Sequence, residues 1–165
     1  MIGSPFAIAL VAATAPAGAP PTPPDSKTIS LTIANSLAGA AIASCRAIGR
    51  EAVVAVVDRG GNLVALQRGD DIGPHNILAA QRKAFTALST KTNTAVLAQR
   101  AASDPGSRNL ATLPELLLLG GGVPLVVKSE VIGGIGVAGS GGSANDERCA
   151  TDAIERSFGA APQRP

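Results

Sequence analysis

Two pairs of short apolar segments, each joined by a tight turn, constrain the fold more than any other feature of this sequence. In the first pair, Asp-Arg-Gly-Gly-Asn separates the runs 52–57 and 63–66. In the second pair, three residues separate the runs 123–127 and 131–137. Glycine and asparagine tolerate the positive φ angles of hairpin turns, and strands joined by short turns must run antiparallel. The sequence therefore predicts two β-hairpins rather than a parallel, doubly wound sheet.

Amphipathic helices are predicted before, between and after the hairpins. Apolar residues recur at three- and four-residue steps from a hydroxyl cap at Ser26 or Thr28 to Gly49, and again from His75 to Leu88. Similar patterns cover 94–102 and 143–158, while the run Leu116–Leu119 breaks at three glycines before resuming at Val123. The order helix, hairpin, helices, hairpin, helix indicates a single α+β domain with an antiparallel sheet flanked by helices.

The two ends of the chain are predicted to lie outside this domain. Residues 1–24 hold a short apolar run, an Ala-Gly-Ala site typical of signal peptidase cleavage and a proline-rich stretch, but no basic residue before the run. Two interpretations stay open, a secretory signal and a disordered Ala/Pro leader. The first implies a periplasmic or secreted protein and the second a cytoplasmic one. The domain is expected over 25–160, with a disordered tail over 161–165.

The amino-acid composition argues against a nucleic-acid partner and against membrane insertion. The chain has three Phe, no Trp or Tyr, and a net charge of +2 without a basic cluster. Nucleic-acid binders use aromatic stacking and cationic tracks, so no nucleic-acid partner is expected. No run of eighteen apolar residues occurs, so no membrane insertion is expected either.

The segment Gly134-Ile-Gly-Val-Ala-Gly139 matches the dinucleotide-binding fingerprint letter for letter. That fingerprint requires an opening βαβ unit and an acidic residue about twenty positions later, which this position near the end of the chain does not supply. No nucleotide cofactor is therefore expected. The glycines are better interpreted as sites where a helix or another subunit approaches the strand closely.

A series of short motifs resembles the GlcG/HbpS-like family, which includes secreted heme-binding proteins and PduO C-terminal-like domains. The motifs occur in the family's order over residues 31–158, at 58–64, 68–70, 73–75, 82–87, 121–125, 133–139 and 146–147. The resemblance implies an antiparallel sheet of about five strands, assembly as a homo-oligomer, often an octamer, and binding of heme or iron. Family membership constrains the fold more closely than the function.

His75 is the only imidazole of the chain and follows Gly73-Pro74 at the predicted start of a helix. It is a candidate axial ligand for heme iron, a candidate acid or base, and with Asp70 and Asp71 a candidate metal ligand. Two alternatives stay open: the imidazole bonds the loop backbone, and the two aspartates are ordinary turn residues.

Arg82, Lys83 and Thr86 lie on the helix that His75 begins. Helical spacing places His75, Arg82 and Thr86 near one face, where they could bind a heme propionate or a small organic acid, and Lys83 is a further ligand-binding or catalytic candidate. Asp58 is the fifth ligand-binding candidate. The alternative is a solvated polar face with an arginine paired to Asp58 or Asp146.

Asp146 and Glu147, in the first turn of the last helix, are candidate acid/base residues if they approach His75 or Lys83 at a subunit interface. Acidic residues at a helix N-terminus are also explained by the helix dipole. Cys45 and Cys149 fall on apolar stripes of two helices. An oxidising compartment would permit a disulfide between them, but we expect free, packed thiols.

Three functions are compatible with these residues. The first is a heme-binding homo-oligomer whose subunit surfaces hold the macrocycle. The second is a cofactor-independent enzyme acting on a small organic acid or aldehyde at a subunit interface, and the third is a non-catalytic interaction module. The sequence leaves open whether the protein is an enzyme.

Overall fold

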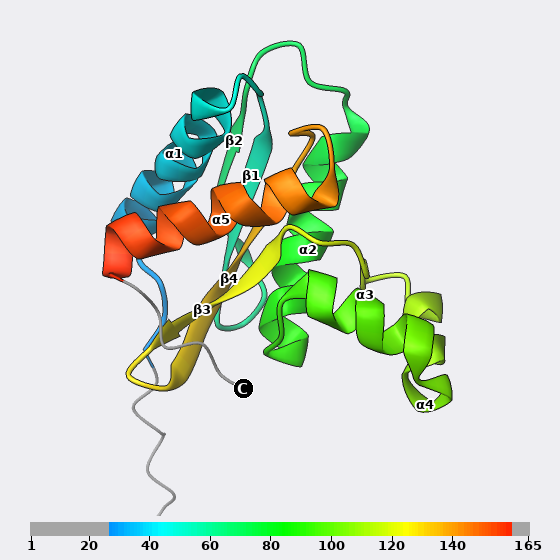
Figure 1. Cartoon of the computed structure of the whole chain (residues 1–165). Coiled ribbons are helices and arrows are strands. Elements are labelled where there is room, and N and C mark those ends of the chain that lie inside the picture. The colour runs from blue at the N-terminus through cyan, green and yellow to red at the C-terminus, as the bar shows by residue number, and fades with distance from the viewer. Residues whose placement is uncertain (1–26, 160–165) are drawn as a thin grey trace, which may run out of the picture.

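The computed structural model describes residues 27–159, which form three layers (Figure 1). The sheet lies between a pair of helices on one face and a single helix on the other. In chain order the elements are α1 (Leu31–Ala47), β1 (Val53–Asp58), β2 (Leu63–Arg68), α2 (His75–Thr90), α3 (Thr94–Ser103), α4 (Pro105–Arg108), the 3-10 helix η1 (Asn109–Thr112), β3 (Gly122–Val127), β4 (Glu130–Ala138) and α5 (Ser143–Phe158). The predicted leader, 1–24, and tail, 161–165, lie outside the described residues.

The described sheet has four antiparallel strands in the order β2-β1-β4-β3. The predicted α+β class, the two hairpins and the helices around them are confirmed. The strand count is slightly below the five or so that the family resemblance implies, and Leu116–Leu119 forms an irregular segment. The first helix is capped by Ser30, whose hydroxyl accepts from the Ile33 amide, rather than by Ser26 or Thr28.

Strand β1 explains why its sequence is apolar without alternation. Val54 and Val56 belong to the core under α1 and α5, whereas Val53, Ala55 and Val57 pack toward α2. A strand covered on both faces needs apolar side chains at every position. The run 53–57 is therefore the centre of two cores.

Helix α2 approaches β4 so closely that the strand requires glycine. A Cβ on Gly134 would collide with the Ala84 carbonyl, and a Cβ on Gly136 with the Ala80 carbonyl. The interpretation of these glycines as close-packing sites is confirmed. Both glycines belong to β4, which pairs with β1 on one side and with β3 on the other. The segment that resembles the dinucleotide fingerprint is therefore a central strand and not a phosphate-binding loop before a helix.

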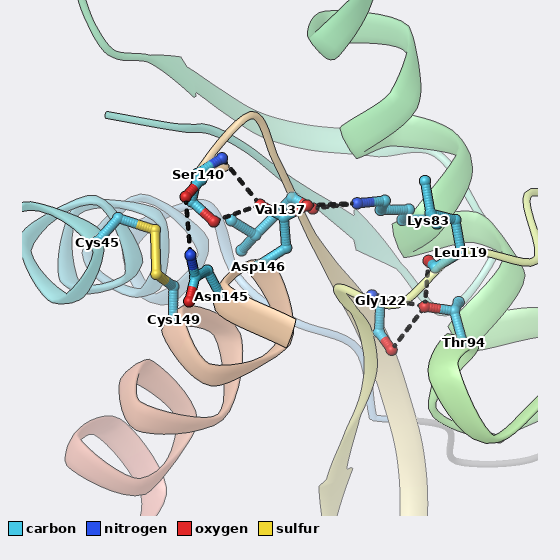
Figure 2. A network of polar contacts seen from close by, with 10 residues as sticks. All are labelled: Cys45, Lys83, Thr94, Leu119, Gly122, Val137, Ser140, Asn145, Asp146 and Cys149. Atoms are coloured by element: carbon cyan, nitrogen blue, oxygen red, sulfur yellow. Dashed lines mark hydrogen bonds and ion pairs between the residues drawn. A yellow bond between two sulfur atoms is a disulfide. The ribbon is translucent and has the colours of Figure 1, made fainter. Parts of the chain in front are cut away.

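Helices α1 and α5 pack side by side on the other face and are joined by a disulfide between Cys45 and Cys149 (Figures 1 and 2). The expectation of free thiols is therefore wrong. The apolar stripes were identified, but helical periodicity does not show that the two stripes face each other with a Cα–Cα distance of 5.3 Å, which suits a disulfide.

Helices α3 and α4 and the helix η1 project from the side of the layered body (Figure 1). Among the described elements, α4 and η1 pack mainly on α3 and contribute no buried residue. Within residues 27–159, no helix has both the length and the apolarity needed to cross a membrane.

The disulfide is expected to contribute strongly to stability, because it closes a loop with a sequence separation of 104 residues. Chain-entropy arguments assign about 4 to 5 kcal/mol to such a loop. Urea unfolding of the Cys45→Ser/Cys149→Ser variant should show a loss of this order in the free energy of unfolding. Alkylation of the unfolded, unreduced wild-type protein is the control, and labelling of both cysteines there would contradict the assignment.

Candidate functional site

A buried ion pair links the two helical layers at the end of β4 (Figure 2). Lys83 on α2 donates to the Asp146 carboxylate on α5 at 2.7 Å and to the Val137 carbonyl on β4 at 2.9 Å. Lys83 is 1% exposed and Asp146 4% exposed. The sequence placed both among the catalytic candidates, and the structure brings them together within one chain.

The surroundings of this pair satisfy its polar atoms and exclude solvent. The other carboxylate oxygen of Asp146 accepts from the amide of Ser140 at 3.0 Å and from its hydroxyl at 2.5 Å. Gly121 packs directly over the pair, and a Cβ there would lie 3.0 Å from the lysine nitrogen. A lysine and an aspartate held in this way fix α2, β4 and α5 together and do not face substrate within the chain.

Thr94 joins α3 to the edge strand β3 through buried hydrogen bonds. It was not singled out from the sequence. Its buried hydroxyl accepts from the Gly122 amide at 2.8 Å and lies 2.8 Å from the Leu119 carbonyl (Figure 2). The next outward-facing position of β3 is Pro124, which has no amide hydrogen. The edge strand is therefore protected against pairing with another strand.

Thr86 and Arg82 hold the segment that leads from η1 to β3. The Thr86 hydroxyl donates to the Arg82 carbonyl and accepts from the Leu117 amide at 2.8 Å, while a terminal nitrogen of Arg82 donates to the Leu116 carbonyl at 2.5 Å. Both side chains reach this segment from α2, Arg82 from a half-buried position and Thr86 from a fully buried one, so they do not share one open face as the spacing predicted. Thr86 is buried and fully engaged, so it takes part in the fold rather than in an open site.

Asp58 closes the first hairpin turn. Its carboxylate accepts from the amides of Gly60 at 2.8 Å and Asn62 at 2.9 Å, and from the Asn62 side chain. Burial alone would raise the pKa of Asp58, but the hydrogen bonds from Asn62 and Gly60 outweigh it and hold the pKa below its usual value. Because the folded-state pKa is lowered, this contribution to stability is present above the unfolded-state pKa and is lost as the pH falls through the folded-state value.

His75 is exposed at the first position of α2, with its ring against Gly73. Its imidazole makes no hydrogen bond with any residue of the described range, so the alternative in which the imidazole bonds the loop backbone is not observed. Asp70 and Asp71 are exposed turn residues. Across 27–159, no three His, Cys, Asp or Glu side chains lie close enough together to hold a metal ion, so the structure does not assemble the predicted set.

Glu147 lies on a cleft of about 890 Å³ between α3, β3 and α5, and among the described residues it forms no ion pair with Lys83 or His75. Its carboxylate accepts from the Asn93 side chain at 3.2 Å, close to the N-terminus of α3. Valines of β3, Pro124 and Ile154 contribute apolar surface, and Lys91, Arg100 and Arg148 contribute cations. Glu147 is the one acid/base candidate from the last helix that faces a cavity.

The outer face of α2 is the second open surface. We define it by Leu78, Gln81, Arg82 and Phe85, which line a pocket of about 240 Å³ together with Val57, Gly61, Leu63 and Glu115. Leu78 is 59% exposed and Leu63 is 48% exposed. His75 precedes Leu78 by one helical turn. This face therefore combines an imidazole, apolar side chains and a guanidinium.

Comparison with known proteins gives a consistent match. The family described as "Haem degrading protein HbpS-like" matches residues 29–155. A double mutant of Streptomyces reticuli HbpS is 38% identical, with a TM-score of 0.77 over 87% of this chain and 97% of that one. The crystal structure titled PduOC:Heme Complex is 26% identical, with a TM-score of 0.72 over 83% and 99% of the two chains. The Escherichia coli protein GlcG is 39% identical over 52% of this chain and 62% of its own length.

Replacement of Lys83 by methionine is expected to lower the free energy of unfolding by about 3 to 5 kcal/mol, since it leaves the Asp146 carboxylate buried without its cation. The double variant Lys83→Met/Asp146→Leu removes both charges and should recover part of this loss. Denaturant unfolding measures both.

The matched control is Arg148→Met, which breaks the exposed pair of Arg148 with Asp152 at 3.9 Å and should cost below about 1 kcal/mol. A Lys83→Met variant as stable as this control would contradict the structural role of the buried pair.

Proposed function

Because the chain belongs to the HbpS-like family, we propose that it is a heme-binding protein whose outer face of α2 would hold the macrocycle, with His75 as the residue that would bind the iron. The observation that carries this proposal is the free imidazole at the start of that face. A neutral imidazole is a common iron ligand in heme proteins, and bound heme supplies an iron centre able to bind and activate oxygen. The PduOC:heme complex is among the chain's structural relatives, which supports the same ligand class.

The residues of this face could cover one side of a heme macrocycle and leave its other side open. Leu78, Leu63 and Phe85 offer apolar surface, and the lone histidine is accessible. The pocket of about 240 Å³ is too small to enclose a macrocycle. We therefore propose that a second copy of the chain covers the other side of the ligand, in a homo-oligomer that assembles to an octamer.

A second candidate function is suggested by the cleft between α3, β3 and α5. Glu147 faces that cleft, and cations stand at its rim, so an organic acid could be bound beside a carboxylate that accepts or donates a proton. Lys83 and Asp146 contribute to the fold instead. Activity would therefore depend on Glu147 and would be independent of His75.

We further propose that the protein is exported to the periplasm or beyond the cell. The disulfide between Cys45 and Cys149 supports this, because buried disulfides persist in oxidising compartments. The signal-like pattern in residues 1–24 points the same way. Mass spectrometry of the mature protein should find a new N-terminus after Ala19, and an intact Met1 in the producing cell would contradict export.

Heme binding is tested by titrating the protein with hemin and recording the Soret band. We expect a shifted, saturable band for the wild-type protein, and for His75→Ala an affinity lower by about tenfold or more, equivalent to about 1.4 kcal/mol. His75 is exposed, so its replacement should leave the fold intact.

Arg156→Gln, an exposed residue of α5 outside both cavities, is the control and should bind hemin like the wild type. Sedimentation of the same samples reports whether hemin binds to an oligomer. An unchanged band in His75→Ala would remove His75 as the ligand, and a wild-type protein without any saturable band would reject heme binding itself.

A further inference from the structure

Arg82 is a partly buried cation without a counter-ion. It forms no ion pair with any residue between 27 and 159. One terminal nitrogen donates to the Leu116 carbonyl at 2.5 Å, which fixes the guanidinium plane, but the Nε atom is buried and has no hydrogen-bond partner. Enclosing a charge in this way is unfavourable unless an anion compensates it.

The pocket beside Arg82 has the walls expected for the apolar part of a ligand. Val57, Leu63, Leu78 and Phe85 line it, and its volume of about 240 Å³ suits a molecule of about ten heavy atoms. The other terminal nitrogen of Arg82, Nη1, makes no hydrogen bond with the described residues. Its two hydrogens are therefore available to a bound anion.

The charged residues that line the pocket limit the charge of the anion that it can bind. Glu115 lines the same pocket but lies too far from Arg82 for an ion pair, so one cation and one anion share the space. A dianion such as phosphate would be repelled by Glu115 more strongly than a monoanion. The apolar walls would also leave the additional phosphate oxygens without donors.

We propose that Arg82 binds the carboxylate of a small ligand with an apolar body, seated in the pocket between α2 and the β1–β2 hairpin. The carboxylate accepts from Nη1, and the apolar body covers Leu63, Leu78 and Phe85. The ligand chemistry has two sources, a free monocarboxylic acid and a propionate of heme. The first source makes this a site of its own, and the second makes Arg82 an anchor for the ligand proposed above. The binding of the carboxylate does not itself depend on heme.

The test uses benzoate as the probe and the nitrogen NMR signal of the Arg82 Nε–H group as the readout. Benzoate should shift this signal to saturation in the full-length protein, whereas benzamide, which has the same shape without the charge, should bind at least about tenfold more weakly. Arg82→Gln should abolish saturable benzoate binding, and Arg156→Gln should retain it.

Two further variants keep the proposal falsifiable if Arg82→Gln fails to fold, since Arg82 also supports the Leu116 carbonyl. Leu78→Asp places a negative charge at the 59% exposed wall and should weaken benzoate binding, whereas Glu115→Gln removes the repelling carboxylate and should strengthen it. The proposal is overturned if benzoate leaves the Arg82 signal unchanged, or if these two variants bind benzoate like the wild type.

Hemin and hemin dimethyl ester distinguish the two sources. If a propionate is the ligand, Arg82→Gln should weaken hemin binding severalfold without affecting the ester, which has no free carboxylate. If hemin and its dimethyl ester each bind equally well to the wild-type protein and to Arg82→Gln, while benzoate still binds the wild type, a free acid is the ligand. The Soret band of the wild type and of His75→Ala reports on heme binding, whereas the Arg82 signal with benzoate reports on the carboxylate site. The two proposals can therefore fail independently.

Discussion

The ion pair between Lys83 and Asp146 is the contact on which the arrangement of the open surfaces depends. It crosses the end of the sheet, from the helix on one face to a helix on the other, and Gly121 packs against it. The irregular stretch 116–119 before this glycine is held by Thr86 at the Leu117 amide and by Thr94 at the Leu119 carbonyl. That stretch supplies the carbonyl that orients Arg82. The direction of the Arg82 guanidinium thus follows from a segment that is anchored by Thr86 and Thr94 beside the buried pair.

Local patterns were sufficient to predict most of the fold. The apolar runs around Gly60-Gly61 and around Lys128 gave both hairpins, and helical periodicity gave α1, α2, α3 and α5 with ends close to those observed. What could not be predicted was which patterned surfaces meet. The leucine run 116–119 is as apolar as a strand, yet it forms none. At the neighbouring edge of β3 the Gly122 amide is taken by Thr94 and Pro124 has no amide hydrogen, which disfavours pairing with a further strand.

The candidate site shows the same limit more sharply. Residue type singled out Lys83 and Asp146 as catalytic candidates and Asp58 and Thr86 as ligand-binding ones, but each is engaged in a turn, an ion pair or a segment anchor. A polar residue near a glycine-rich motif looks the same in sequence whether it faces a ligand or a backbone amide. Asp70 and Asp71 are exposed in a turn, and His75, Arg82 and Glu147 lie on the two open surfaces described above or beside them. The pairing of Cys45 with Cys149 was missed for a similar reason, because stripes on helices far apart in the chain carry no information about their mutual distance.

Helix α2 therefore separates two roles by its faces. Its inner face is built from alanines, the buried Lys83 and Thr86, and must remain so because Gly134 and Gly136 of β4 leave no room for larger groups. Its outer face carries the exposed Leu78 and the half-buried Arg82, whose side-chain hydrogen bond goes to the Leu116 carbonyl. The orientation of Arg82 couples the two sides, because it depends on a segment that the inner face holds in place.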